Sequence, residues 1–166
     1  MENKYELTDE CKIEAGVKLF RIRALKEIDR FSVKIGDLGG WIENEDNLNQ
    51  SGNAWVSGDA KVSGNAWVSG NAEVYGNAEV SGNAEVYGDA EVSGNADYMV
   101  FKNSWSSGRY FTFTRSNKMW KVGCFHGTGE ELIKKAYADS ELSGRCYEAV
   151  VKAVEQIEAA KAELMK

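Results

Sequence analysis

The chain has 166 residues, of which 43% are apolar and none is proline, and this composition predicts a folded protein rather than a disordered one. Its net charge of −6 is concentrated in residues 36–98, where one Lys and eleven Asp/Glu would repel a nucleic acid backbone. No apolar run nears the roughly 20 residues of a membrane span, and three cysteines without CxxC spacing argue against a disulfide framework and a zinc site.

Residues 1–35 predict a β-rich cap at the N-terminal end of the fold. The segment 17–25, VKLFRIRAL, alternates apolar residues with arginines, which is typical of a half-buried strand. Val33 and Ile35 alternate in the same way just before a glycine-rich stretch. We expect this cap to close the open end of the repeat array that follows, because terminal repeats need a polar cover.

Residues 36–98 contain a six-residue repeat. Glycines recur every six residues from Gly52 to Gly94, each followed by Asn or Asp and then Ala, and a valine follows two residues later from Val56 to Val92. This period fits neither an α-helix nor collagen. It predicts a very short strand with Ala and Val on one face, joined to the next strand by a Gly-Asn or Gly-Asp corner.

The repeat resembles the hexapeptide repeat of left-handed parallel β-helix proteins, in which three hexapeptides form one triangular coil. It differs in placing Gly at the third position instead of the second. An eighteen-residue coil predicts that Trp55, Glu73 and Glu91 stack, that Lys61, Glu79 and Asp97 stack, and that Trp67 lies above Glu85. We expect the two tryptophans to point outward and to be covered by the N-terminal segment or by a neighbouring subunit.

Residues 99–166 predict a small C-terminal α+β unit. The segments DYMVFK, RYFTFT and KMWKVGCF predict three strands, the last two joined by a turn at residues 115–118. Thr128 and Glu131 form a capping-box pattern that begins a helix ending near Ala138. A longer helix is predicted from about Arg145, with an apolar stripe at helical spacing: Tyr147, Val150, Val151, Val154, Ile157 and Leu164.

Several motifs of the chain resemble, in order, those of the YdcK-like hexapeptide-repeat proteins of bacteria and their phages. They are LFRIRALKEI, KIGDLGGWIENEDNLNQSGNAWV, the GNAxV array and WKVGCFHGTGEEL, and they cover nearly the whole chain. The resemblance implies a β-helix that assembles into trimers, and it implies little chemistry.

The sequence predicts no catalytic residue, no metal ligand and no cofactor. Hexapeptide-repeat acyltransferases, which this chain resembles in architecture, generally use a histidine from a coil, whereas His126 is the chain's one histidine and lies outside the array. Cys124 and His126 could form a thiol–imidazole pair, but residues two apart in a strand share a face by default. We therefore expect a structural cysteine.

The hairpin region of the C-terminal unit gathers cations, hydroxyls and aromatic rings within about twenty residues. One interpretation is a small β core with a solvated basic turn. The other is a pocket for a planar anion such as a nucleotide, because rings stack on bases and arginines bind phosphates. The candidate ligand-binding residues are Trp105, Ser107, Arg109, Tyr110, Arg115, Trp120 and His126.

These observations predict a non-catalytic homotrimeric binding protein, phage-encoded by the resemblance. Its C-terminal unit binds a small anionic or nucleotide-derived ligand, with sequestration of a host defence signal as one role. The alternatives are a structural or protein-docking module that meets a host protein, including an acidic mimic of nucleic acid, and an acyltransferase. The expected location is the cytoplasm, that of the host cell for a phage protein, without membrane contact.

Overall fold

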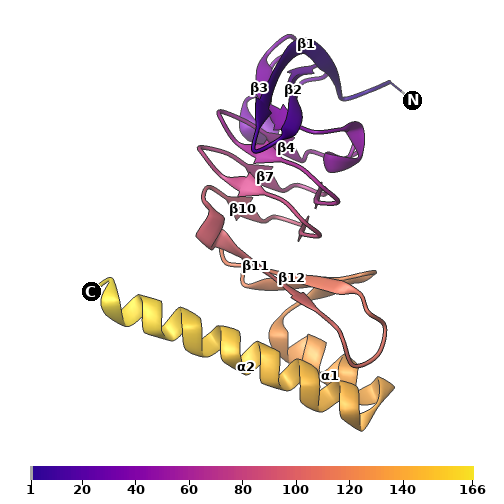
Figure 1. Cartoon of the computed structure of the whole chain (residues 1–166), viewed down its shortest axis with the longest axis vertical. Coiled ribbons are helices and arrows are strands. Elements are labelled where there is room, and N and C mark those ends of the chain that lie inside the picture. The colour runs from indigo at the N-terminus through magenta and orange to yellow at the C-terminus, as the bar shows by residue number, and fades with distance from the viewer. Residues whose placement is uncertain (1) are drawn as a thin grey trace.

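The computed structural model describes residues 2–166 and is mainly β, with several sheets and a small helical unit at its C-terminal end. Figure 1 shows the N-terminal strands at one end of the long axis, the short repeat strands stacked in the middle, and the C-terminal sheet and helices at the other end. The three predicted segments therefore follow one another along the molecule.

The N-terminal segment forms a β cap, as predicted. Its first two strands pair as an antiparallel hairpin, and the second strand pairs antiparallel with a third that continues into the repeat strands. Ile22 is fully buried, whereas Ile35 is 67% exposed. The predicted alternation of Val33 and Ile35 is wrong, because Val33 bridges to Ile28 in a tight loop instead of extending a strand. These strands are β1 (Tyr5–Glu14), β2 (Val17–Ala24) and β3 (Leu38–Ile42).

The repeats form seven strands of two residues each. Each strand before the last layer pairs in parallel with the strand eighteen residues later, so Trp55 stacks on Glu73 and Glu73 on Glu91. Three stacks result, one of which continues from β3. The strands are β4 (Trp55–Val56), β5 (Lys61–Val62), β6 (Trp67–Val68), β7 (Glu73–Val74), β8 (Glu79–Val80), β9 (Glu85–Val86) and β10 (Glu91–Val92).

Alanine and valine fill the space between the stacks. Every Ala and Val of the repeat from Ala54 to Val92 is at most 1% exposed. The corners carry glycines in the left-handed region, such as Gly52 with φ of 73°, where a side chain would be strained. Each six-residue repeat thus contains a buried Ala-Val pair and a corner whose backbone conformation only glycine adopts easily.

The two outward tryptophans differ in their surroundings. Trp55 is only 2% exposed and belongs to the same core cluster as Ile22, so the N-terminal segment covers it. Trp67 is half-buried and lies near Tyr87, with 6.4 Å between ring centroids. The predicted stacks are confirmed except at Asp97, which lies in a short 3-10 helix, η3 (Asn95–Asp97).

The last repeat layer is closed by side chains of the C-terminal part. In earlier layers the residue after each Ala donates its N–H to an Ala carbonyl of the next layer, as Trp55 does to Ala72 at 3.0 Å. The last layer has no successor, and three side-chain oxygens replace it. They are Asn95 Oδ1 for the N–H of Glu79, Thr112 Oγ1 for that of Glu85, and Ser116 Oγ for that of Glu91, at 2.7–2.9 Å.

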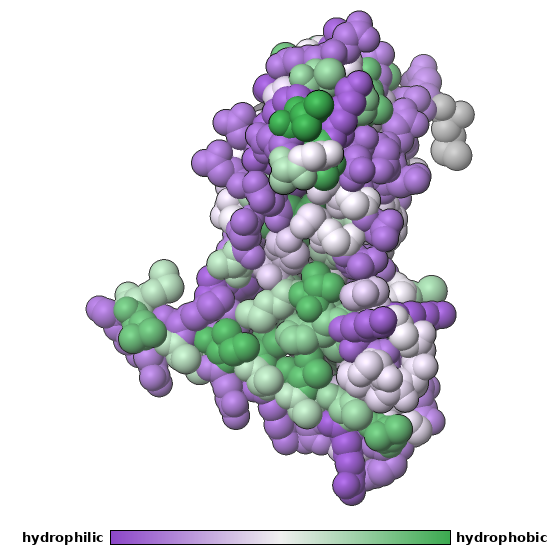
Figure 2. Space-filling view, in the orientation of Figure 1, coloured by the Kyte–Doolittle hydropathy of each residue, from purple (hydrophilic) through white to green (hydrophobic). Residues whose placement is uncertain are grey.

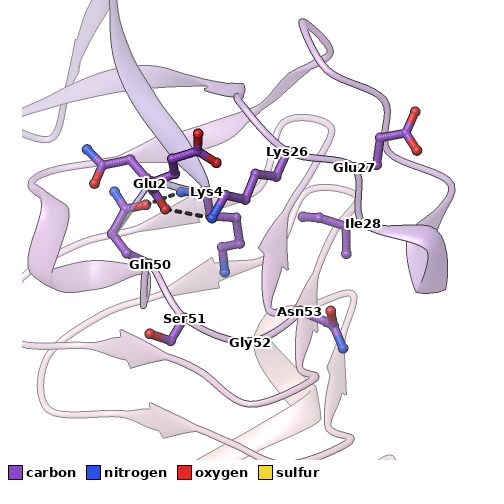
Figure 3. Close-up of a pocket in the computed structure, with 10 residues that line it drawn as sticks. Glu2, Lys4, Lys26, Glu27, Ile28, Gln50, Ser51, Gly52 and Asn53 are labelled. Carbon is purple, nitrogen blue, oxygen red and sulfur yellow. Dashed lines mark hydrogen bonds between the residues drawn. The ribbon is translucent and has the colours of Figure 1, made fainter.

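At the first repeat layer the groups that need partners are backbone carbonyls, and N–H donors from the preceding part of the chain bind them. Lys4 Nζ donates to the Ala54 carbonyl at 2.7 Å, and Asn47 Nδ2 donates to the Ala66 carbonyl at 2.9 Å. The N–H of Trp41 in β3 serves the Ala60 carbonyl. Figure 3 shows the Lys4 side chain extending between the segment that contains Gln50 and the loop that contains Ile28.

The C-terminal unit has four antiparallel strands instead of the predicted three. The segment KMWKVGCF breaks at Gly123, whose φ of 54° turns the chain between the third and fourth strands. The turn at residues 115–118 is confirmed. The strands are β11 (Tyr98–Lys102), β12 (Tyr110–Thr114), β13 (Met119–Val122) and β14 (Phe125–Gly127).

Two helices cover one face of this sheet. The capping box of Thr128 and Glu131 begins α1 (Gly129–Asp139) as predicted, and Ser140 caps α2 (Glu141–Leu164), which begins four residues earlier than expected. The stripe of α2 is buried only as far as Val154. Figure 2 shows apolar residues gathered along α2 and over the sheet beneath the repeats.

Thr112→Val tests the closure of the last layer, since valine has the shape of threonine but leaves the N–H of Glu85 without an acceptor. We expect the free energy of unfolding in urea to fall by about 1–3 kcal/mol. Thr112→Ser keeps the hydroxyl and should lose only about 0.8 kcal/mol, for the methyl group. Equal losses in the two variants would show that the hydroxyl does not close the edge.

Lys4→Met tests the buried ammonium at the first layer. Burial lowers the pKa of Lys4 from 10.5 to about 8. The unfolded chain therefore binds more protons between these pH values, and the wild type should gain stability as pH rises through this window. Relative to Lys4→Met, we expect a gain of about 2 kcal/mol between pH 7 and pH 10 in urea unfolding. Lys26→Met, at an exposed lysine, is the control, and a pH-independent difference for Lys4→Met contradicts the prediction.

Candidate binding sites of the C-terminal unit

The structure does not bring the seven predicted ligand residues together. Arg109 precedes β12 and Arg115 follows it, so the two guanidinium groups lie at opposite ends of an extended strand of five residues. Arg115 Nε donates to Glu158 Oε2 on α2 at 2.6 Å. This ion pair is partly buried and neutralises one of the two cations that the sequence assigns to an anion.

Trp120 is 2% exposed and belongs to the aromatic core between the sheet and the helices. Its ring centroid lies 5.1 Å from that of Phe113 and 5.8 Å from that of Phe111. Tyr110 is half-buried, with Lys102 Nζ 5.7 Å from its ring centroid. The indole of Trp120 therefore supports the core and is not free to stack on a base.

His126 packs against the repeat region instead of joining the other candidates. Its ring meets that of Tyr87 edge-on with centroids 4.9 Å apart, and it lies close above Gly88. Burial and the charge of Lys121 lower the pKa of His126, while Asp89 opposes the shift. Among residues 2–166 no hydrogen bond joins His126 to Cys124, which is exposed in the turn before β14. This histidine connects the sheet to the last repeat layer.

Two of the predicted residues, Ser107 and Arg109, line a pocket of about 180 Å³. The pocket lies between the loop before β12 and the region where α1 meets α2. Trp105 lies behind it, edge-on to Tyr147 at 5.1 Å. We call this the hydroxyl pocket; its polar lining consists of Asn103, Ser106, Ser107, Arg109, Lys135, Asp139, Ser143 and Tyr147.

The buried polar groups of the hydroxyl pocket have unused hydrogen-bonding capacity. Tyr147 Oη accepts from Asn103 Nδ2 at 3.1 Å, and within residues 2–166 its own O–H has no acceptor. Ser143 is 7% exposed, and its side chain lines the same pocket. Arg109 and Lys135 are exposed and form no ion pair within residues 2–166. Two hydroxyl donors and two cations thus line one small cavity.

No local pattern in the sequence indicates Lys135, Ser143 or Tyr147 as site residues. The sequence predicts Tyr147 in an apolar stripe, and Ser143 lies before the predicted start of the second helix. The missed signal was Ser140, whose hydroxyl accepts from the N–H of Ser143 at 3.1 Å and begins α2. A helix that begins at this cap has Ser143 and Tyr147 one turn apart on the same face.

A second pocket, of about 470 Å³, lies between α2 and the ends of β12 and β13. Its walls are mostly apolar, and Lys118, Glu155 and Glu158 line it as well. In Figure 2 this region belongs to the apolar band along α2. We call it the α2 groove; its apolar lining is Phe113, Trp120, Gly129, Val151, Val154, Ala159 and Ala162.

A third pocket, of about 370 Å³, lies beside Lys4 and Gln50 at the N-terminal end (Figure 3). Its two lysines already have partners: Lys4 donates to the Ala54 carbonyl and Lys26 to the Glu2 carbonyl at 2.7 Å. Glu2 and Glu27 line the same pocket and oppose an anion. The hydroxyl pocket is therefore the better candidate for a small ligand.

Comparison with known proteins assigns no family, since no family model and no curated protein matches the chain. Among residues 2–166, no three His, Cys, Asp or Glu side chains are grouped so that they could hold a metal ion. In the same part of the chain no helix combines the length and the apolar character needed to cross a membrane.

Proposed function

We propose that residues 36–98 form a left-handed parallel β-helix of eighteen residues per turn. The parallel pairing at this offset, the three stacks of strands and the left-handed glycines at the corners support this fold. The hexapeptide-repeat resemblance supports the hand. The motifs GDLGGWIE and GCFHGT support membership of the YdcK-like proteins.

We further propose that the protein is a non-catalytic binding protein whose C-terminal unit binds one small anionic group in the hydroxyl pocket. The carrying observation is the combination of two hydroxyl side chains on the pocket wall, Ser143 and Tyr147, with two cations that form no ion pair within residues 2–166, Arg109 and Lys135. Charge-assisted hydrogen bonds from such donors are the strongest contacts that a phosphate or carboxylate receives.

The size and charge of the pocket define the ligand further. A volume of about 180 Å³ is below the roughly 300–1,000 Å³ of pockets that enclose a drug-sized molecule. It fits a phosphate or carboxylate group, while the rest of a nucleotide-derived ligand would lie outside. Asp139 on the lining opposes an anion, but the two cations outnumber it. A nucleotide-derived host signal sequestered by a phage protein fits this chemistry through its phosphate.

The arrangement of the histidine supports a binding role over acyl transfer. His126 is the chain's one histidine, and it packs against Tyr87 outside both C-terminal pockets. Neither the hydroxyl pocket nor the α2 groove contains a histidine or cysteine. The second candidate function is a structural or docking module, and the apolar α2 groove favours it.

Isothermal titration calorimetry with inorganic phosphate and with a nucleoside monophosphate tests the binding proposal. We expect millimolar or tighter binding, weakened about tenfold by Arg109→Ala or Lys135→Ala, since a charged hydrogen bond contributes roughly 1.5–3 kcal/mol. Ser143→Ala should also weaken binding.

Lys118→Ala is the matched control, because this lysine lines the α2 groove and not the hydroxyl pocket. It should bind phosphate like the wild type. An Arg109→Ala protein with wild-type affinity, or a wild type that binds neither probe, would contradict the proposal.

A further inference from the structure

The distal half of α2 extends beyond the sheet that the first half covers. A helix of 24 residues is about 36 Å long, and none of its residues after Val154 is buried. Figure 1 shows its C-terminal end projecting to one side of the molecule. A long helix with an unburied half is stable when another surface covers that half.

The α2 groove lies directly beside this projecting half. Ala159 and Ala162 form its helical side, and Phe113 lies on the opposite side. Small side chains on the helix leave a volume of about 470 Å³ between apolar walls. Contact between apolar walls and water is unfavourable, so an apolar side chain that fills the groove would be stabilised there.

The same helix end carries large exposed apolar residues. Leu164 is 90% exposed, Met165 is 82% exposed and Ile157 is 43% exposed. Ile157 and Leu164 are seven residues apart and share a face, whereas Glu155, Ala159 and Ala162 lie on the face that lines the groove. Apolar residues gathered at one exposed helix end are a feature of interaction surfaces, whereas single exposed apolar residues are not.

The charges of the groove and of the helix end are complementary. Lys118 and Glu155 line the groove, and within residues 2–166 neither takes part in an ion pair. The helix end carries Glu163 and Lys166, which are equally unpaired within that range. Each charge at the groove therefore has an opposite charge at the helix end.

We propose that the distal end of α2 from one copy of the chain lies in the α2 groove of a second copy, with Leu164 and Met165 against Phe113 and Ala159. The contact joins two different surfaces of the chain, and such contacts close into a ring when the rotation from one copy to the next returns to the first copy. A ring of three agrees with the trimer that the family resemblance implies. Both edges of the repeat strands are already hydrogen-bonded, so end-to-end stacking does not compete.

Mixing two variants tests this proposal. Leu164→Asp blocks the helix end and Ala159→Trp fills the groove. We expect sedimentation equilibrium of the wild type to give three times 18.3 kDa, and each variant alone to give 18.3 kDa. An equimolar mixture should give twice 18.3 kDa, because the intact helix end of one variant enters the intact groove of the other.

Leu142→Asp is the control, since Leu142 is 59% exposed at the opposite end of α2 and should leave assembly unchanged. Circular dichroism verifies folding, and Ala162→Arg replaces Ala159→Trp if that variant unfolds. A wild type of 18.3 kDa at micromolar concentration, or a mixture that stays monomeric, overturns the inference. Phosphate binding by the monomeric variants would show that the ligand pocket stands independently of this contact.

Discussion

The backbone N–H and C=O groups at the two ends of the repeat stacks need hydrogen-bond partners, and the arrangement of the other elements follows from this constraint. Each repeat strand forms only a few backbone hydrogen bonds to the layers on either side, so the first and last layers have unpaired groups. Donors from Lys4 and Asn47 serve one edge, and acceptors from Thr112 and Ser116 serve the other. Closed edges also prevent pairing with other chains.

Closure of the last layer fixes the C-terminal unit. The alternation along β12 places the Thr112 hydroxyl on the repeats, while Phe111 and Phe113 face the helices and build the second core. One strand therefore belongs to both halves of the molecule. As a consequence, the hydroxyl pocket and the α2 groove both lie on the helical side of the sheet, away from the acidic repeats.

The candidate site could be only partly predicted. Arg109 and Arg115 are close in sequence, but an extended strand separates them by roughly 20 Å, and the nearest carboxylate to Arg115 comes from Glu158, 43 residues away. Ser107 and Arg109, which the sequence predicts in one region, line one pocket. Their partners Lys135, Ser143 and Tyr147 come from two helices, and nothing in the local sequence reports which helix faces which loop.

The sequence alone determined the elements whose causes are local: the six-residue period, the buried Ala-Val pair, the glycine corners and the capping box at Thr128. These depend on a few neighbouring residues, so a short stretch contains all the information. The tertiary structure decided that Trp55 is covered by the N-terminal cap and that Trp120 enters the core. It also decided which side chains close the strand edges, because each of these contacts joins segments whose distance in space no local pattern encodes.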